Sequence, residues 1–80
     1  MVSNEQIKMA RAAFGWSVDK LAKDSSVGVR TIHRIEAQVG MPNTTAGNLK
    51  LIRENLEAAG IEFIGDADDG PGIRLWTIQE

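Results

Sequence analysis

The chain has 80 residues, with nine lysines and arginines, eleven aspartates and glutamates, and no cysteine. This length supports one hydrophobic core, so we expect residues 1–80 to form a single domain. The lack of cysteine excludes disulfides and thiolate metal sites, and His33 alone cannot hold zinc. Charges interrupt every apolar run before the ~20 residues that a membrane span needs, and residues 1–5 lack the features of a secretory signal. We therefore expect a cytoplasmic protein, without a membrane association or a cofactor.

The charges are unevenly distributed along the chain. A net charge of −2 argues against nucleic-acid binding, because phosphates attract basic proteins. Residues 1–40, however, hold six cations and four anions, whereas residues 41–80 hold three cations and seven anions. The acidic C-terminal part is therefore expected to face away from DNA.

Four helices are predicted in chain order. A capping pair, Ser3-Asn4, begins the first helix, which ends at Gly15. Ser17 caps a short second helix, because the turn-forming run 24–28 stops it. The third extends from about Val29 to Gln38. The fourth is capped within 43–45, carries apolar residues at three- and four-residue spacing, and ends at Gly60.

The end of the chain changes to a strand pattern. Residues 61–64 and 73–78 are rich in β-branched and aromatic side chains, and the turn-forming segment 65–72 separates them. They predict a two-stranded β-hairpin over about 61–78. The aspartates within 65–72 lack the ligand spacing and bidentate glutamate of a calcium loop, so we expect a solvated turn.

Residues 17–38 carry the functional pattern. They predict a short helix, a tight turn and a second short helix that presents Arg30, His33 and Arg34. Such a second helix protrudes far enough to enter the DNA major groove. Arginine there donates a pair of hydrogen bonds to guanine, while the helix that begins at Ser17 directs its N-terminus at a phosphate. A solvated helix face is the alternative for the two arginines, and His33 fits either interpretation equally well.

Several short motifs carry a family resemblance. Leu21-Ala22, Val27, Thr31-Ile32 and Arg34-Ile35-Glu36 resemble the core pattern of the Xre/Cro/C1-type helix-turn-helix regulators, and residues 11–17 (RAAFGWS) resemble its lead-in. Residues 48–52, 56–63 and 72–75 resemble the fourth helix and the strands of a bacterial subset. The resemblance covers nearly the whole chain. It implies a mainly α fold, in which a four-helix Cro/C1-type domain precedes a C-terminal two-stranded hairpin.

The resemblance also implies roles for individual residues. Base-reading positions, with His33 beside them, are occupied by Val29, Arg30 and Arg34. Backbone-contacting positions are occupied by Ser17, Thr31 and Asn43. An ion pair between Arg11 and Glu36 would tie the first helix to the recognition helix. The chain departs from the pattern at two DNA-facing positions, because Val18 replaces a polar residue and Gly28 replaces a serine or threonine cap. Ser25-Ser26 also replaces the common alanine-glycine of the turn.

The hairpin suggests a homodimer. Period-2 alternation places large apolar groups on both faces of the ribbon, yet a hairpin on a four-helix domain buries only one of them. Pairing with a second copy would cover the other. The dimerisation residues are predicted to be Ile64, Leu75, Trp76 and Ile78. The alternative is a lone hairpin that folds onto the helices and leaves Trp76 exposed.

Together these patterns predict a sequence-specific, double-stranded-DNA-binding transcriptional regulator. We expect a repressor that acts as a homodimer on a palindromic operator and is nucleoid-associated through DNA binding. The alternative is a protein-interaction module, antiactivator- or antitoxin-like, in which Val18, Val29 and Trp76 bury against another protein. An enzyme is not expected, because no paired carboxylates, activated nucleophile or cofactor loop can be identified.

Overall fold

The computed structural model describes residues 2–38, 42–65 and 68–76. Helix α1 (Asn4–Phe14) begins as the sequence predicts, because the Ser3 hydroxyl accepts from the Gln6 N–H and the Gln6 side chain accepts from the Ser3 N–H. It ends at Gly15, whose φ of 68° is a left-handed conformation that glycine adopts without strain.

The second and third helices are short and are joined by a short turn, as predicted. Helix α2 (Val18–Ser25) starts at Ser17, whose hydroxyl accepts from the Lys20 N–H. Helix α3 (Val29–Glu36) ends two residues before the predicted Gln38. The last turn tightens there, since the N–H of Gln38 bonds to the carbonyl of Ile35, three residues back.

Helix α4 (Ala46–Ala58) follows a Thr45 cap and leads into the hairpin of β1 (Ile61–Ile64) and β2 (Gly72–Leu75). The strands are antiparallel, with Ile61 opposite Leu75 and Ile64 opposite Gly72. The second strand was predicted over 73–78, but it begins one residue earlier, at Gly72, and ends at Leu75. Residues 77–80, including the predicted dimerisation residue Ile78, lie outside the described residues. Four helices followed by a two-stranded hairpin confirm the predicted mainly α fold class.

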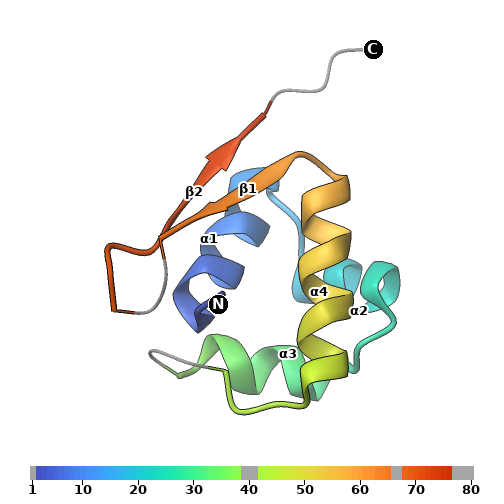
Figure 1. Cartoon of the computed structure of the whole chain (residues 1–80). Helices are drawn as coiled ribbons and strands as arrows, with labels where there is room; N and C mark the ends of the chain where they lie inside the picture. The colour runs from blue at the N-terminus through green and yellow to red at the C-terminus, as the bar shows by residue number, and fades with distance from the viewer. Residues whose placement is uncertain (1, 39–41, 66–67, 77–80) are drawn as a thin grey trace.

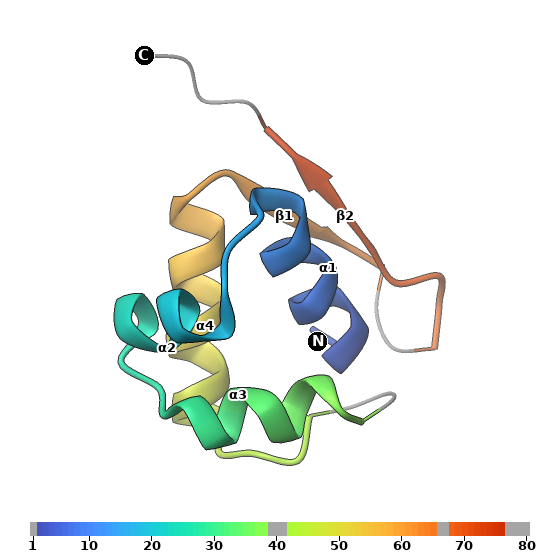
Figure 2. The ribbon, with the colours of Figure 1, turned by 180° about the vertical axis from the view of Figure 1, so that it is seen from behind.

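The helices and the hairpin share one core. Helix α3 lies along the lower edge of the molecule and the strands lie at the upper edge, with α1 and α4 between them (Figures 1 and 2). Every element except β2 contributes a buried apolar side chain. The core consists of Val2, Ile7, Ala10, Leu21, Ala22, Val27, Ile32, Ile35, Ile52, Leu56 and Ile61. No helix in the described ranges has both the length and the apolar character needed to cross a membrane.

Gln6 joins the start of α1 to the closed end of the hairpin. Its side chain is completely buried, and its amide nitrogen donates to the carbonyls of Ile64 at 2.8 Å and Gly72 at 2.9 Å. Its amide oxygen accepts from the Ser3 N–H at 2.8 Å. Each polar atom of this buried amide therefore has a partner, as a buried amide requires.

Replacing Gln6 with methionine tests this link. Gln6→Met keeps the approximate size of the side chain but leaves the Ser3 N–H and two strand carbonyls without this partner. We expect a loss of about 2–4 kcal/mol in the free energy of unfolding. Urea denaturation followed by circular dichroism measures it. The exposed Lys8→Met serves as a control, and a Gln6→Met loss no greater than that of the control would contradict the role of Gln6.

Candidate nucleic-acid interface

The turn between α2 and α3 is held by buried side chains. Val27 is buried in the core, and the buried Ser25 hydroxyl donates to the carbonyl of Leu21 at 2.6 Å. Ser26 adopts a left-handed conformation with a φ of 64°, the only non-glycine residue to do so in the described segments. This conformation is costly for any residue with a Cβ, which explains why glycine is the common residue at a helix end of this kind. The joint is therefore fixed, although it retains local strain.

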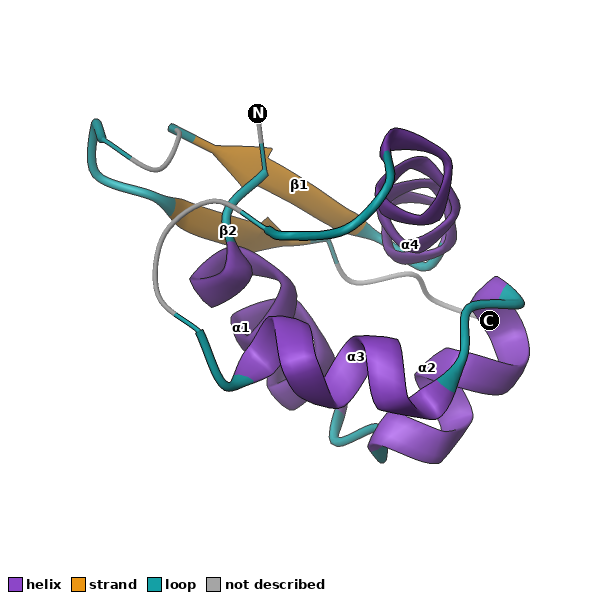
Figure 3. Ribbon diagram, turned by 90° about the horizontal axis from the view of Figure 1, so that it is seen from below, coloured by secondary structure: helices purple, strands orange, loops and turns teal. Residues whose placement is uncertain are grey.

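Helix α3 buries one face and presents cations on the other. Its two isoleucines, Ile32 and Ile35, are completely buried, and Arg30, His33 and Arg34 are exposed. Neither arginine forms an ion pair with a described residue. Helix α3 lies beside α2 (Figure 3). Because the three cationic and imidazole side chains are exposed, they face solvent.

The acid of α3 does not offset this positive charge locally. Glu36 accepts two hydrogen bonds from Arg11, from Nε at 2.7 Å and from Nη2 at 2.8 Å, and its side chain is 9% exposed. Arg11 also donates from Nη1 to the carbonyl of Trp16 at 2.6 Å. The predicted pairing of Arg11 with Glu36 is thus present, with a bidentate geometry that fixes orientation. The contact to Trp16 was not predicted, because no sequence pattern specifies a bond to a backbone carbonyl.

Hydrogen bonding to Glu36 raises the pKa of Arg11 above its ordinary value, while burial opposes this shift. A group whose pKa is raised in the folded state stabilises the fold below its ordinary pKa. That contribution is lost only as the pH rises through the folded-state value. The stabilisation from Arg11 therefore stays constant across the physiological pH range.

The other predicted interface residues occupy different environments. Ser17, Gly28, Val29 and Asn43 are exposed, and Thr31 is half-buried. Val18 is half-buried and packs against the core, so its side chain supports α2 instead of offering a polar contact. Gly28 begins α3 without a side-chain cap, and a Cβ added there would meet only the Thr31 hydroxyl, at 4.0 Å. The position therefore has room for the serine or threonine that it lacks.

An aromatic cluster supports the start of α2. The rings of Phe14 and Trp16 stack at 4.6 Å, and the Lys20 ammonium lies 4.9 Å from the Trp16 ring centroid. Lys20 also pairs with Asp24 at 2.8 Å. Spacing alone hints at this arrangement, because Lys20 follows Trp16 by four residues, but the loop between them prevents a prediction from helix periodicity.

The predicted dimerisation surface is exposed on both faces of the hairpin. Ile64, Leu75 and Trp76 are 37%, 44% and 57% exposed. Ile64 and Trp76 share the outer face with Glu62, which accepts hydrogen bonds from Arg74 Nη1 at 3.0 Å and from the Trp76 indole N–H at 2.9 Å. The Arg74 guanidinium lies 5.7 Å from the Trp76 ring centroid. Trp76 is therefore held in place before any partner binds.

Among the described residues, no three histidine, aspartate or glutamate side chains cluster closely enough to hold a metal ion. Comparisons of the chain with protein-family models, with curated proteins and with solved structures gave no match in any of the three.

Removing Arg11 should uncouple α3 from α1. Arg11→Leu leaves the largely buried Glu36 carboxylate without its cation and the Trp16 carbonyl without a donor. We expect a loss of about 2–4 kcal/mol in the free energy of unfolding. The double variant Arg11→Leu/Glu36→Leu should recover part of this loss, because it removes the uncompensated charge. Chemical denaturation of both variants measures the difference, and equal stability of Arg11→Leu and the wild type would rule out the proposed constraint.

Proposed function

We propose that the chain is a sequence-specific, double-stranded-DNA-binding transcriptional regulator whose α3 enters the major groove. The observation that carries this proposal is the exposed surface of α3, which presents Arg30, His33 and Arg34 while its acid, Glu36, is neutralised by Arg11. A helix with exposed guanidinium groups, which pair with none of the described acids, is suited to the acceptor atoms of guanine. The N-terminus of α2, at Ser17, is suited to a backbone phosphate.

Occupying promoter DNA is the simplest consequence of such binding, so we propose a repressor. A regulator of this kind works in the cytoplasm, associated with the nucleoid. Thr31, on α3, and Asn43, in the segment between α3 and α4, are proposed to contact the DNA backbone. Gly28 has no side chain, so it can offer the DNA only its backbone N–H group. Base specificity is therefore proposed to come mainly from the side chains of α3.

The reading residues are tested by selecting a duplex from a random pool and measuring affinity by fluorescence anisotropy at several salt concentrations. Arg30→Ala and Arg34→Ala should each cost about 1–3 kcal/mol on the selected duplex and relax the base preference. Arg53→Ala, an exposed arginine on α4, is the matched control and should bind normally. Normal binding by both α3 variants would disprove the assigned reading helix.

We also propose that two copies pair through the hairpin, so that two reading helices address a palindromic operator. Seen from below, β1 lies on the side of the molecule opposite α3, with β2 and α1 between them (Figure 3). A partner added beyond the hairpin would therefore leave both reading helices uncovered. The exposed Trp76 and Ile64 supply the apolar area for this contact.

The hairpin contact is tested by sedimentation equilibrium without DNA. Trp76→Ala should weaken the dimer about tenfold or more, since a held, exposed tryptophan is a typical interface anchor. Leu51→Ala, an apolar residue of similar exposure on α4, should leave the mass unchanged. A monomeric wild-type chain at all concentrations would exclude the dimer in the free protein.

A protein-interaction module is the second candidate. The apolar exposure of Val29 at the start of α3, together with that of Trp76, favours it, because neither side chain pairs with a phosphate. Under this alternative, a folded chain would show no salt-dependent DNA binding in the titration above.

A further inference from the structure

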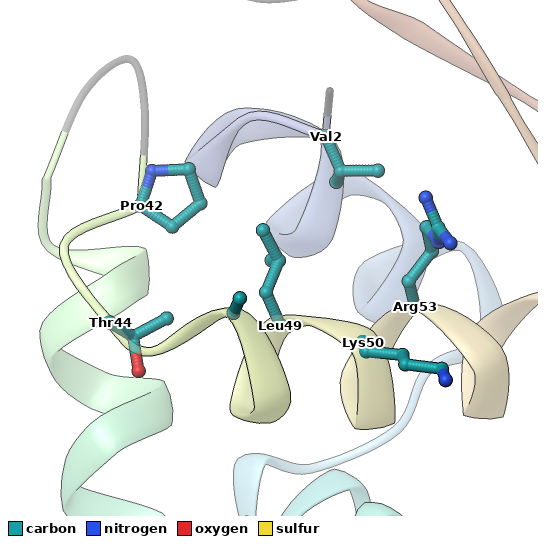
Figure 4. Close-up of a pocket in the computed structure, with 7 residues that line it drawn as sticks. Val2, Pro42, Thr44, Leu49, Lys50 and Arg53 are labelled. Carbon is teal, nitrogen blue, oxygen red and sulfur yellow. The ribbon is translucent and has the colours of Figure 1, made fainter.

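A groove of about 340 Å³ opens between the N-terminal end of α1, the start of α4 and the segment before α4 (Figure 4). Its walls are mainly aliphatic. The lining residues are Val2, Pro42, Thr44, Ala46, Leu49, Lys50 and Arg53. Val2 is only 5% exposed, and Leu49 packs against the core, so the floor is firmly held. The volume lies within the roughly 300–1,000 Å³ that is typical of small-molecule sites.

The groove is polarised along its length. Pro42 and Thr44 lie at one end, and Lys50 and Arg53 lie at the other (Figure 4). The Thr44 hydroxyl is directed away from Leu49, and it accepts a hydrogen bond from Asn48 Nδ2 at 3.2 Å. The Thr44 end is therefore apolar, whereas the opposite end is cationic.

The two cations lack strong acidic partners. Arg53 forms no ion pair with a described residue. The Lys50 ammonium lies 4.0 Å from the Glu54 carboxylate, with the two side chains 67% and 56% exposed. Such an exposed pair contributes little and is easily displaced by a better-placed anion.

We propose that this groove binds a small amphipathic monoanion. Its carboxylate would lie at the Arg53 guanidinium, since the Lys50 ammonium is directed away from Arg53 (Figure 4), and its aliphatic chain would extend over Leu49 and Val2 toward Pro42. The guanidinium can donate two parallel hydrogen bonds to a carboxylate, and burial of the chain supplies the remaining affinity. This inference rests on the groove alone and does not depend on DNA binding.

The test is a titration of the ¹⁵N-labelled full-length chain with sodium octanoate, without DNA, followed by ¹H–¹⁵N NMR. We expect saturable shifts of the amide signals of Leu49, Lys50 and Arg53. The neutral analogue 1-octanol should bind about tenfold more weakly, because it lacks the carboxylate. The proposal is overturned if the shifts do not saturate, if 1-octanol binds with equal affinity, or if the shifts are centred on Trp76.

Variants locate the carboxylate. Arg53→Gln should weaken octanoate binding about five- to tenfold, whereas Lys23→Gln, which removes an exposed cation from α2, should not change it. Ala46→Glu places a second carboxylate in the groove, at the first residue of α4, where an acid is favourable to the helix. It should therefore fold normally and weaken octanoate binding, because it places a charge where the aliphatic chain would extend. Wild-type affinity in both Arg53→Gln and Ala46→Glu would refute the site, and it would leave the proposed DNA binding unaffected.

Discussion

The bidentate contact of Arg11 with Glu36 is the constraint on which the proposed interface depends. The guanidinium joins α1, the carbonyl of Trp16 before α2, and the last turn of α3. Helix α3 has only eight residues, so its direction must come from tertiary contacts and not from its own stability. The same contact removes the one acid of α3 from the local charge balance. The orientation of α3 and the positive charge of its surface therefore both depend on the contact between Arg11 and Glu36.

Gln6 has the corresponding role at the opposite end of α1. It bonds to two carbonyls of the hairpin, whereas Arg11 bonds to α3, and about one and a half helical turns separate the two residues. Helix α1 thus sets the position of the hairpin relative to α3. If the hairpin pairs two copies, as proposed, the spacing of the two reading helices is determined through this helix.

The net charge of −2 is a poor guide to this surface. Acids elsewhere in the chain form ion pairs with nearby cations. Asp24 pairs with Lys20, and Glu62 pairs with Arg74. The arginines of α3 form no ion pair with any residue that the structure describes. The chain also tolerates weak local choices beside α3, since Ser26 is left-handed and Gly28 provides no cap. Burial of Leu21, on α2, and of Val27, within the turn, offsets their local cost.

The sequence by itself determined the local structure. Caps at Ser3, Ser17 and Thr45 and the stop at Gly15 specify helix ends, because each satisfies or terminates backbone groups within a few residues. Apolar spacing specified which faces are buried. Helix and strand ends without a side-chain signal were predicted too far along the chain, as the shorter α3 and β2 demonstrate.

Only the tertiary structure decided which distant groups meet. The bonds from Gln6 to Ile64 and Gly72 cross 58 and 66 residues, and the groove at Leu49 and Arg53 needs Val2 for its floor. A backbone carbonyl can accept a hydrogen bond whatever the residue type. The sequence therefore predicted neither the bonds of Gln6 to the hairpin nor the bond of Arg11 to the Trp16 carbonyl. Pairing of Arg11 with Glu36 was expected only from a family resemblance. Periodicity fixes which face a side chain occupies, whereas packing fixes which other element that face meets.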